Sequence, residues 1–162
     1  MSKNNIDEND FSIFKMFEDE GFYFDITQLG LFKSPEKSFA YMVEGYKKAA
    51  DILIDKALSQ EGYKEHMAEI LIYPILFCYR HFIELKIKKI FYDFYSGDPE
   101  KMKPIIDLNH DLQKLWEELY LLSKKYDAID DNYEFEEIGN WINEFHNLDT
   151  KSMRFRYPIN KK

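Results

Sequence analysis

The sequence predicts an all-α protein, a four- to five-helix up-down bundle, from three observations. Apolar residues recur at helical spacing in four long segments, and no segment over this region alternates with the two-residue period of a strand. Only 6 glycines and 5 prolines occur among 162 residues, so few positions interrupt a helix. Aromatic residues make up 17 % of the chain and supply bulky side chains for a helical core.

The first predicted helix runs from Pro35 to about Ser59. Ser34 suits the N-cap and Pro35 the first turn. The second helix is predicted from about Lys64 to Tyr95, where the sequence Ser-Gly-Asp-Pro stops it. Pro74 lies inside this segment and is expected to bend the helix or to start it afresh.

The third predicted helix begins near Asn109, and the fourth runs from about Asn132 to Leu148. Each carries an apolar stripe at helical spacing, which predicts packing against other helices. The stripes consist of Leu112, Leu115, Leu119 and Leu122 in the third helix, and of Ile138, Trp141, Ile142 and Phe145 in the fourth.

These helices predict one bundle domain over 34–162, preceded by an N-terminal arm over 1–33. The arm is rich in aromatic and aliphatic residues, so we expect it to pack on the bundle or on a second subunit. The longest apolar run, Ile70 to Tyr79, is too short for a bilayer. The polar N-terminus and the single cysteine, Cys78, favour a cytoplasmic protein without disulfides.

Charge is distributed unevenly along the chain, whose formal net charge is −8. The net charge argues against non-specific coating of nucleic acid. Residues 127–149 hold acidic side chains and no lysine or arginine, whereas 151–162 hold basic side chains and no acid. This division predicts a solvated acidic face with a frayed tail, pairing of the two segments, a protein partner, or a local phosphate site.

The centre of the second helix carries a group of charged residues between aromatic neighbours. At about 100° per residue, Arg80, Glu84 and Lys88 fall within ~80° of one another, and His81 lies ~20° beyond Lys88. Tyr73 and Phe77 precede them on the same side of the helix. The charges therefore interrupt a face that its flanks mark as buried.

Two interpretations of this group stay open. In one, Arg80, Glu84 and Lys88 form a structural ion network, and His81 is a hydrogen-bonded core histidine. In the other, Arg80 and His81 line a cleft that holds an anion such as an RNA phosphate.

The remaining histidines and the cysteine are weighed in the same way. His110 lies at the start of the third helix, where a neutral imidazole suits acid–base chemistry or simply stands near a cap. His146 can donate a hydrogen bond to carbonyl groups at the end of the fourth helix. His66 has no neighbouring residues that suggest a site, and Cys78 is predicted to be a core residue. No metal-ligand spacing and no glycine-rich phosphate loop occurs, so we expect neither a metal nor another cofactor.

The C-terminal sequence Lys-Ser-Met-Arg-Phe-Arg-Tyr-Pro supplies the candidate phosphate-binding residues Arg154, Arg156 and Tyr157. Arg154 and Arg156 cannot share a helix face, so an extended or turning segment is predicted. Such a segment can lay its guanidinium groups on a phosphate or on the acidic helix before it.

Three phrases resemble those of the HEPN superfamily of small bacterial helical proteins. They are RHFIELKIK in a long apolar helix, HDLQKLW opening another helix, and FHNLD followed by SMRFRYP. The resemblance covers roughly 34–158. The resemblance implies a helical bundle, commonly dimeric, from toxin–antitoxin or anti-phage defence systems. It also implies metal-independent RNA cleavage by the 2′-OH, with an arginine on the phosphate and a histidine transferring protons across the dimer interface.

The chain departs from the superfamily at its catalytic signature, in which a histidine follows an arginine after four to six residues. Arg80 is followed directly by His81, and no histidine follows Arg154 or Arg156. We therefore expect a composite site with Arg80, His81 and His110 as catalytic residues and Arg156 on the phosphate.

Two function classes follow from the sequence, with a small-ligand binder as a third. One is an RNA-binding protein of a stress or defence system that acts as a metal-independent ribonuclease. The other is a catalytically silent interaction module, an antitoxin or assembly subunit. A second copy of the chain, RNA, and a protein from the same operon are the expected partners, and no membrane is expected.

Overall fold

The computed structural model describes residues 34–64, 66–126, 133–150, 152 and 154–156. Within these ranges the chain is all-α, with six helices and no strand. The helices are α2 (Pro35–Leu58), α3 (Gln60–Lys64), α4 (Met67–Phe94), α5 (Pro99–Asp107), α6 (Leu112–Lys125) and α7 (Tyr133–Leu148). The predicted N-terminal arm, 1–33, lies outside the described residues.

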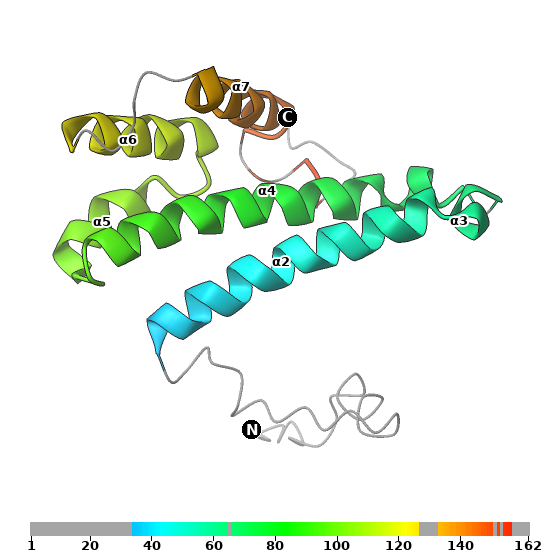
Figure 1. Ribbon diagram of the computed structural model, residues 1–162, viewed down its shortest axis with the longest axis horizontal. Helices are drawn as coiled ribbons and strands as arrows, with labels where there is room; N and C mark the ends of the chain where they lie inside the picture. The colour runs from blue at the N-terminus through cyan, green and yellow to red at the C-terminus, as the bar shows by residue number, and fades with distance from the viewer. Residues whose placement is uncertain (1–33, 65, 127–132, 151, 153, 157–162) are drawn as a thin grey trace, which may run out of the picture.

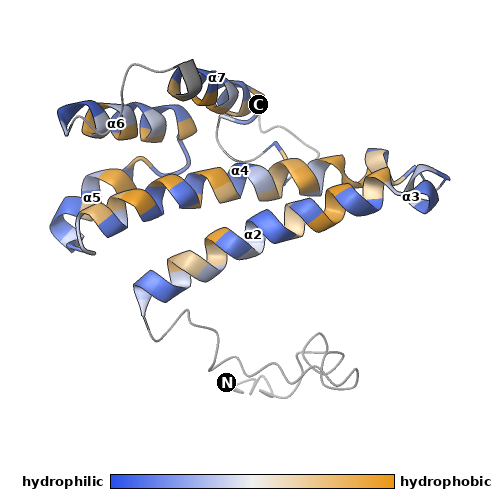
Figure 2. Cartoon of the chain, viewed as in Figure 1, coloured by the Kyte–Doolittle hydropathy of each residue, from blue (hydrophilic) through white to orange (hydrophobic). Residues whose placement is uncertain are grey.

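The long helix α4 lies between two groups of helices (Figure 1). Helix α2 runs antiparallel along one side of α4, and α5, α6 and α7 lie on the other side. In Figure 2, α4 is coloured as hydrophobic over much of its length, as expected for a helix covered on two sides.

Helix α2 packs on α4 through small residues at seven-residue intervals. Val43, Ala50 and Ala57 are its buried residues, and their size lets the two helices approach closely. A polar contact joins the same helices, because the Tyr79 hydroxyl donates a hydrogen bond of 2.8 Å to Asp51. Ser34 caps α2 by accepting a hydrogen bond from the backbone N–H of Lys37.

The main apolar core lies on the C-terminal half of α4. It consists of Ile87 and Phe91 from α4, Met102 and Ile105 from α5, Leu112, Leu115 and Leu119 from α6, and Ile142 from α7. This core fixes α5, α6 and α7 against α4 and so determines what stands next to the charged centre of that helix.

The second predicted helix begins at Met67, close to its expected start near Lys64. The backbone φ of 53° at His66 separates it from α3. Helix α4 then continues through Pro74, which is exposed, so water can satisfy the carbonyl group that proline leaves without its helical partner.

Helix α5 is absent from the helices expected from apolar periodicity, although its start signal is present in the sequence. Asp98 caps the helix by accepting a hydrogen bond of 3.1 Å from the N–H of Glu100, and Pro99 occupies the first turn. The Gly-Asp-Pro sequence therefore ends one helix and starts the next. The third predicted helix accordingly begins at Leu112, with Asp111 as its N-cap.

The apolar stripe predicted on the fourth helix is only partly buried. Ile142 is buried in the core, whereas Trp141 is 55 % exposed and Ile138 is 40 % exposed. The start of α4 also departs from the expectation of a buried apolar run, because Ile70 and Tyr73 are more than half exposed. The apolar core shared with α5, α6 and α7 includes Ile87 and Phe91 from the C-terminal half of α4, and Ile70 and Tyr73 lie beyond it.

Candidate functional site

Three charged residues of α4 form a buried ladder along one face of the helix. Arg80, Glu84 and Lys88 follow at four-residue intervals, with side-chain exposures of 0 %, 2 % and 14 %. Glu84 stands between the two cations, with its carboxylate oxygens 3.5 Å from Arg80 Nη1 and 2.8 Å from Lys88 Nζ. The side chains predicted to share a buried face therefore do so.

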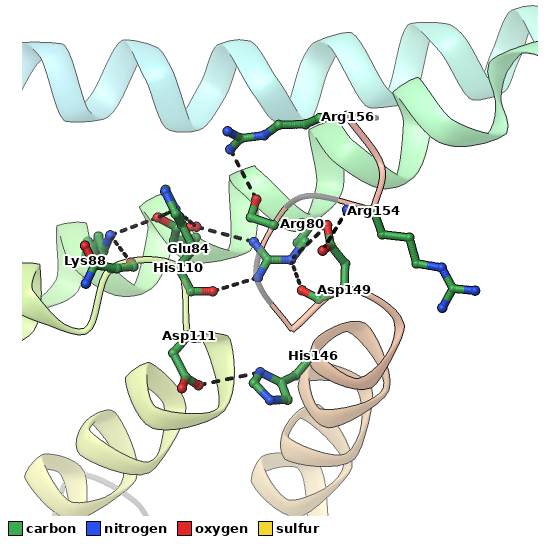
Figure 3. A network of polar contacts seen from close by, with 11 residues as sticks. Arg80, Glu84, Lys88, His110, Asp111, His146, Asp149, Arg154 and Arg156 are labelled. Carbon is green, nitrogen blue, oxygen red and sulfur yellow. Dashed lines mark hydrogen bonds and ion pairs between the residues drawn. The ribbon is translucent and has the colours of Figure 1, made fainter. Parts of the chain in front are cut away.

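The ladder holds the loop that leads into α6. Lys88 Nζ donates a hydrogen bond of 2.6 Å to the carbonyl oxygen of Asn109, and Arg80 Nη2 donates one of 2.6 Å to that of His110. Asn109 adopts a left-handed backbone conformation, with φ 53°, which asparagine tolerates better than most residues. Two consecutive carbonyl groups are thus fixed by cations on one helix face (Figure 3).

The same arginine also holds the C-terminal segment. Arg80 Nε donates a hydrogen bond of 3.1 Å to the carbonyl oxygen of Asp149 and lies 4.0 Å from a carboxylate oxygen of that residue. The other carboxylate oxygen accepts a hydrogen bond of 3.0 Å from the backbone N–H of Arg154. Asp149 is itself buried, so Arg80 joins the end of α7 and the turn after it to α4.

His110 is oriented by the ladder but exposed to solvent. Its Nδ1 lies 3.0 and 3.1 Å from the two carboxylate oxygens of Glu84, and its side chain is 44 % exposed. An ionised carboxylate only accepts hydrogen bonds, so Nδ1 carries the hydrogen and Nε2 is left as the basic nitrogen. This arrangement of a buried carboxylate and an exposed imidazole is suited to proton transfer.

The charge of Glu84 is maintained by its neighbours. Burial acts to raise the pKa of Glu84, but the hydrogen bonds and charges of Lys88 and His110 outweigh burial and hold the pKa below its ordinary value. Burial lowers the pKa of Arg80, and the charges of Asp149 and Glu84 oppose that shift. An arginine side chain nevertheless stays protonated, so the ladder alternates in charge.

His81 lies in an aromatic setting beside the ladder. Its ring stacks on Phe77 with centroids 5.7 Å apart and lies nearly perpendicular to the Tyr46 ring, with centroids 4.4 Å apart. Its Nδ1 is buried without a hydrogen-bond partner, and burial lowers the pKa of His81. Burial therefore favours the neutral form of the ring, and the predicted hydrogen bond of a core histidine is missing at Nδ1.

Arg156 covers the same aromatic group from the C-terminal segment. Its guanidinium carbon lies 5.1 Å from the centroid of the Phe77 ring, a cation–π contact. One Nη donates a hydrogen bond of 3.2 Å to the hydroxyl of Ser152, which is buried and adopts a left-handed φ of 55°. Arg156 is exposed, so this turn presents a fixed cation to solvent.

The four residues of the predicted composite site lie in two contacting groups. Arg80 contacts the backbone of His110, whereas Arg156 and His81 meet at Phe77. Arg80 has no exposed surface and uses all three guanidinium nitrogens within the protein. In this arrangement Arg80 positions its neighbours, and the cleft stays a prediction.

The other residues considered for the site differ in their positions and contacts. Arg154 is exposed, donates a hydrogen bond of 3.3 Å to the carbonyl oxygen of Leu148 and points away from Arg156 in Figure 3. Tyr157 lies outside the described residues. The buried Nδ1 of His146 has no hydrogen-bond partner, so this nitrogen does not cap α7. It lies 3.5 Å from a carboxylate oxygen of Asp111. Cys78 is half-buried, and burial raises the pKa of its thiol.

Two residues of the site, Asp149 and Ser152, have no sequence signal that singles them out. Asp149 is one of several acids in 127–149, and Ser152 lies in the basic tail. Their contacts depend on a tight turn after α7, and the only local signal was a helix end followed by a mixture of polar and basic residues. In the part of the chain described by the structure, no three histidine, cysteine, aspartate or glutamate side chains are grouped as metal ligands.

Comparisons with known proteins give no match: no family model, no curated protein and no solved structure is similar enough to this chain. None of the described helices is both long enough and apolar enough to cross a membrane.

Proposed function

We propose that the chain is a HEPN-like helical protein of a bacterial stress or defence system that binds RNA and cleaves it without a metal ion. The observation that carries the proposal is the exposed imidazole of His110, held through Nδ1 by the buried carboxylate of Glu84 at 3.0 Å. A histidine fixed in one tautomer by a carboxylate is the group that general base catalysis near neutral pH requires.

In the proposed reaction Nε2 of His110 takes the proton from the RNA 2′-OH. The 2′-oxygen then attacks the adjacent phosphorus, forming a 2′,3′-cyclic phosphate while the bond from phosphorus to the 5′-oxygen breaks. The leaving 5′-oxygen takes a proton from water, and the protonated His110 returns its own proton to solvent. A role for His81 in proton transfer stays a prediction, because its half-buried ring is only partly accessible to RNA.

Arg156 is the proposed phosphate-binding residue, with Arg154 and Tyr157 as further predicted contacts. Arg156 is exposed, and its contacts with Phe77 and Ser152 fix its guanidinium group before a phosphate arrives. Arg80 is proposed to act through other residues, because it holds the backbone of both His110 and Asp149.

The experiment is an RNA cleavage assay with the purified full-length chain in excess chelator. We expect cleavage with a 2′,3′-cyclic phosphate product, and no cleavage at a position where a 2′-deoxynucleotide replaces the ribonucleotide. Cleavage that persists at the 2′-deoxy position would overturn the mechanism. Absence of both binding and cleavage over a panel of RNAs would overturn the function.

The proposal also includes the architecture, the oligomeric state and the location of the chain. We propose that the helices form an up-down bundle, that the aromatic arm over 1–33 packs on it, and that the chain is a cytoplasmic homodimer. The antiparallel course of α2 and α4 supports the bundle.

A second candidate function is a catalytically silent interaction module that binds a protein from the same operon. It is favoured by exposed apolar side chains on α7, where Trp141 is 55 % and Leu148 is 47 % exposed beside acidic residues. Co-expression with the neighbouring gene products tests it. A stable complex lost in Trp141→Ala supports this function, and the absence of any complex counts against it.

A further inference from the structure

Tyr73 is an exposed aromatic side chain in line with the ladder of α4. At about 100° per residue it lies within ~20° of Glu84 and ~40° of Phe77 around the helix. It stands one turn before Phe77, the ring covered by Arg156, and is itself 57 % exposed. The other exposed aromatic side chain described on α4, Phe94, lies ~80° away from Glu84 and packs on Tyr95 and Tyr126.

The distances along the helix match an elongated ligand. Residues four apart on a helix have Cβ atoms about 5–6 Å apart, so Tyr73 neighbours the place where Arg156 crosses Phe77. Glu84, which holds His110, follows Tyr73 by about 16 Å at 1.5 Å per residue. An aromatic ring, a cation and an oriented imidazole thus follow one another on one side of α4.

An aromatic ring, a cation and an imidazole in this order are typical of a site that binds single-stranded nucleic acid. Proteins that bind single strands combine cations for the backbone with aromatic side chains on which unpaired bases stack. A base within a duplex has both faces covered by its neighbours and cannot stack on a side chain in this way. The partly buried ring of Phe77 cannot serve, because Arg156 lies over it.

We infer that the substrate of the proposed site is single-stranded RNA, with one base stacked on Tyr73, its phosphate on Arg156, and the reacting ribose at His110. This inference rests on the proposed function and names its substrate class. Tyr73 is then a specificity-determining residue for unpaired RNA.

The test measures binding by fluorescence anisotropy with a labelled, non-cleavable 2′-O-methyl oligopyrimidine, alone and annealed to its complement. The proteins are wild type, Tyr73→Ala, Tyr73→Phe and the control Tyr63→Ala, in which a tyrosine that is 84 % exposed on α3 is removed. Circular dichroism verifies that each variant is folded.

We expect Tyr73→Ala to weaken binding of the single strand about tenfold, the order of one base-stacking contact. Tyr73→Phe, which keeps the ring, and Tyr63→Ala are expected to bind like wild type, and the duplex to bind more weakly. Equal affinity of wild type and Tyr73→Ala for the single strand overturns this inference and leaves the proposed function standing. Absence of binding by wild type overturns this inference, and the proposed function falls with it when binding and cleavage are also absent over the RNA panel.

Discussion

Arg80 Nη2 donates a hydrogen bond of 2.6 Å to the carbonyl oxygen of His110, 30 residues later in the sequence. Because its Nε binds the carbonyl oxygen of Asp149, the one side chain connects α4 with the loop before α6 and the turn after α7. A buried charge of this kind is tolerated only when each of its donors is satisfied, which makes the contacts mutually dependent.

Arg80→Ala is expected to destabilise the fold by about 3–5 kcal/mol, because it removes the buried cation between Glu84 and Asp149 and its hydrogen bonds to the carbonyl groups of His110 and Asp149. The free energy of unfolding from urea titration measures the effect. Lys86→Ala, a change at an exposed lysine of the same helix, is the control and should stay within about 0.5 kcal/mol of wild type. A loss below about 1 kcal/mol for Arg80→Ala would show that the connection contributes little.

Glu84→Gln is expected to make the free energy of unfolding depend less on pH in the acidic range. The folded pKa of Glu84 lies below its ordinary value of 4.5, so the unfolded chain binds the proton more readily. The stabilisation is therefore complete above about pH 4.5 and is lost as the pH falls through the lower, folded pKa. Urea titrations across this range should give a flatter curve for Glu84→Gln, while Glu118→Gln, at an exposed position of α6, keeps the wild-type slope.

His81→Phe is expected to make the free energy of unfolding depend less on pH at a higher pH than Glu84→Gln does. Burial lowers the folded pKa of His81 below its ordinary value of 6.5, so the unfolded chain takes up the proton first. The contribution of the neutral His81 ring to stability is therefore fully present above about pH 6.5. It is lost as the pH falls towards the folded pKa. Unfolding free energies between about pH 7 and 5 test this against His66→Phe, whose side chain is exposed. Equal slopes for wild type and His81→Phe would contradict burial of a neutral ring.

Gly139→Ala and Gly45→Ala form a matched pair that tests the packing of α7 on α6. A Cβ at Gly139 would lie 2.8 Å from Trp116 Nε1, whereas one at Gly45 meets nothing within 4 Å. We expect Gly139→Ala to destabilise by about 1–3 kcal/mol because the indole ring must move. Gly45→Ala should instead stabilise by about 0.4–1 kcal/mol, since alanine restricts the unfolded chain and favours a helix. The same sign for both changes in thermal unfolding would contradict the described contact.

The sequence was sufficient to predict the all-α class and most helices, because those depend on local periodicity and capping. It was also sufficient to predict that Arg80, Glu84 and Lys88 share a buried face, which follows from their four-residue spacing. The contacts of Arg80 with His110 and Asp149 span 30 and 69 residues, and no local pattern contains them. The turn at Ser152 depends on a left-handed backbone at a non-glycine residue, for which serine gives no signal.

Burial on α7 and at the start of α4 was predicted less well for a related reason. Periodicity identifies which side of a helix is apolar, but the reach of neighbouring helices decides how much of that side is covered. Trp141 belongs to an apolar stripe and Ile70 to the longest apolar run, yet their exposed fractions are 55 % and 61 %.

The catalytic role of His110 is tested most directly by the rate at which single-stranded RNA is cleaved in excess chelator. The variants are His110→Asn, Glu84→Gln and the two combined, with His66→Asn as control and unfolding measured in parallel. We predict that His110→Asn lowers the rate by about 10²–10⁴ and that adding Glu84→Gln lowers it no further, because Glu84 acts through His110. A folded His110→Asn protein that cleaves at the wild-type rate would contradict the account.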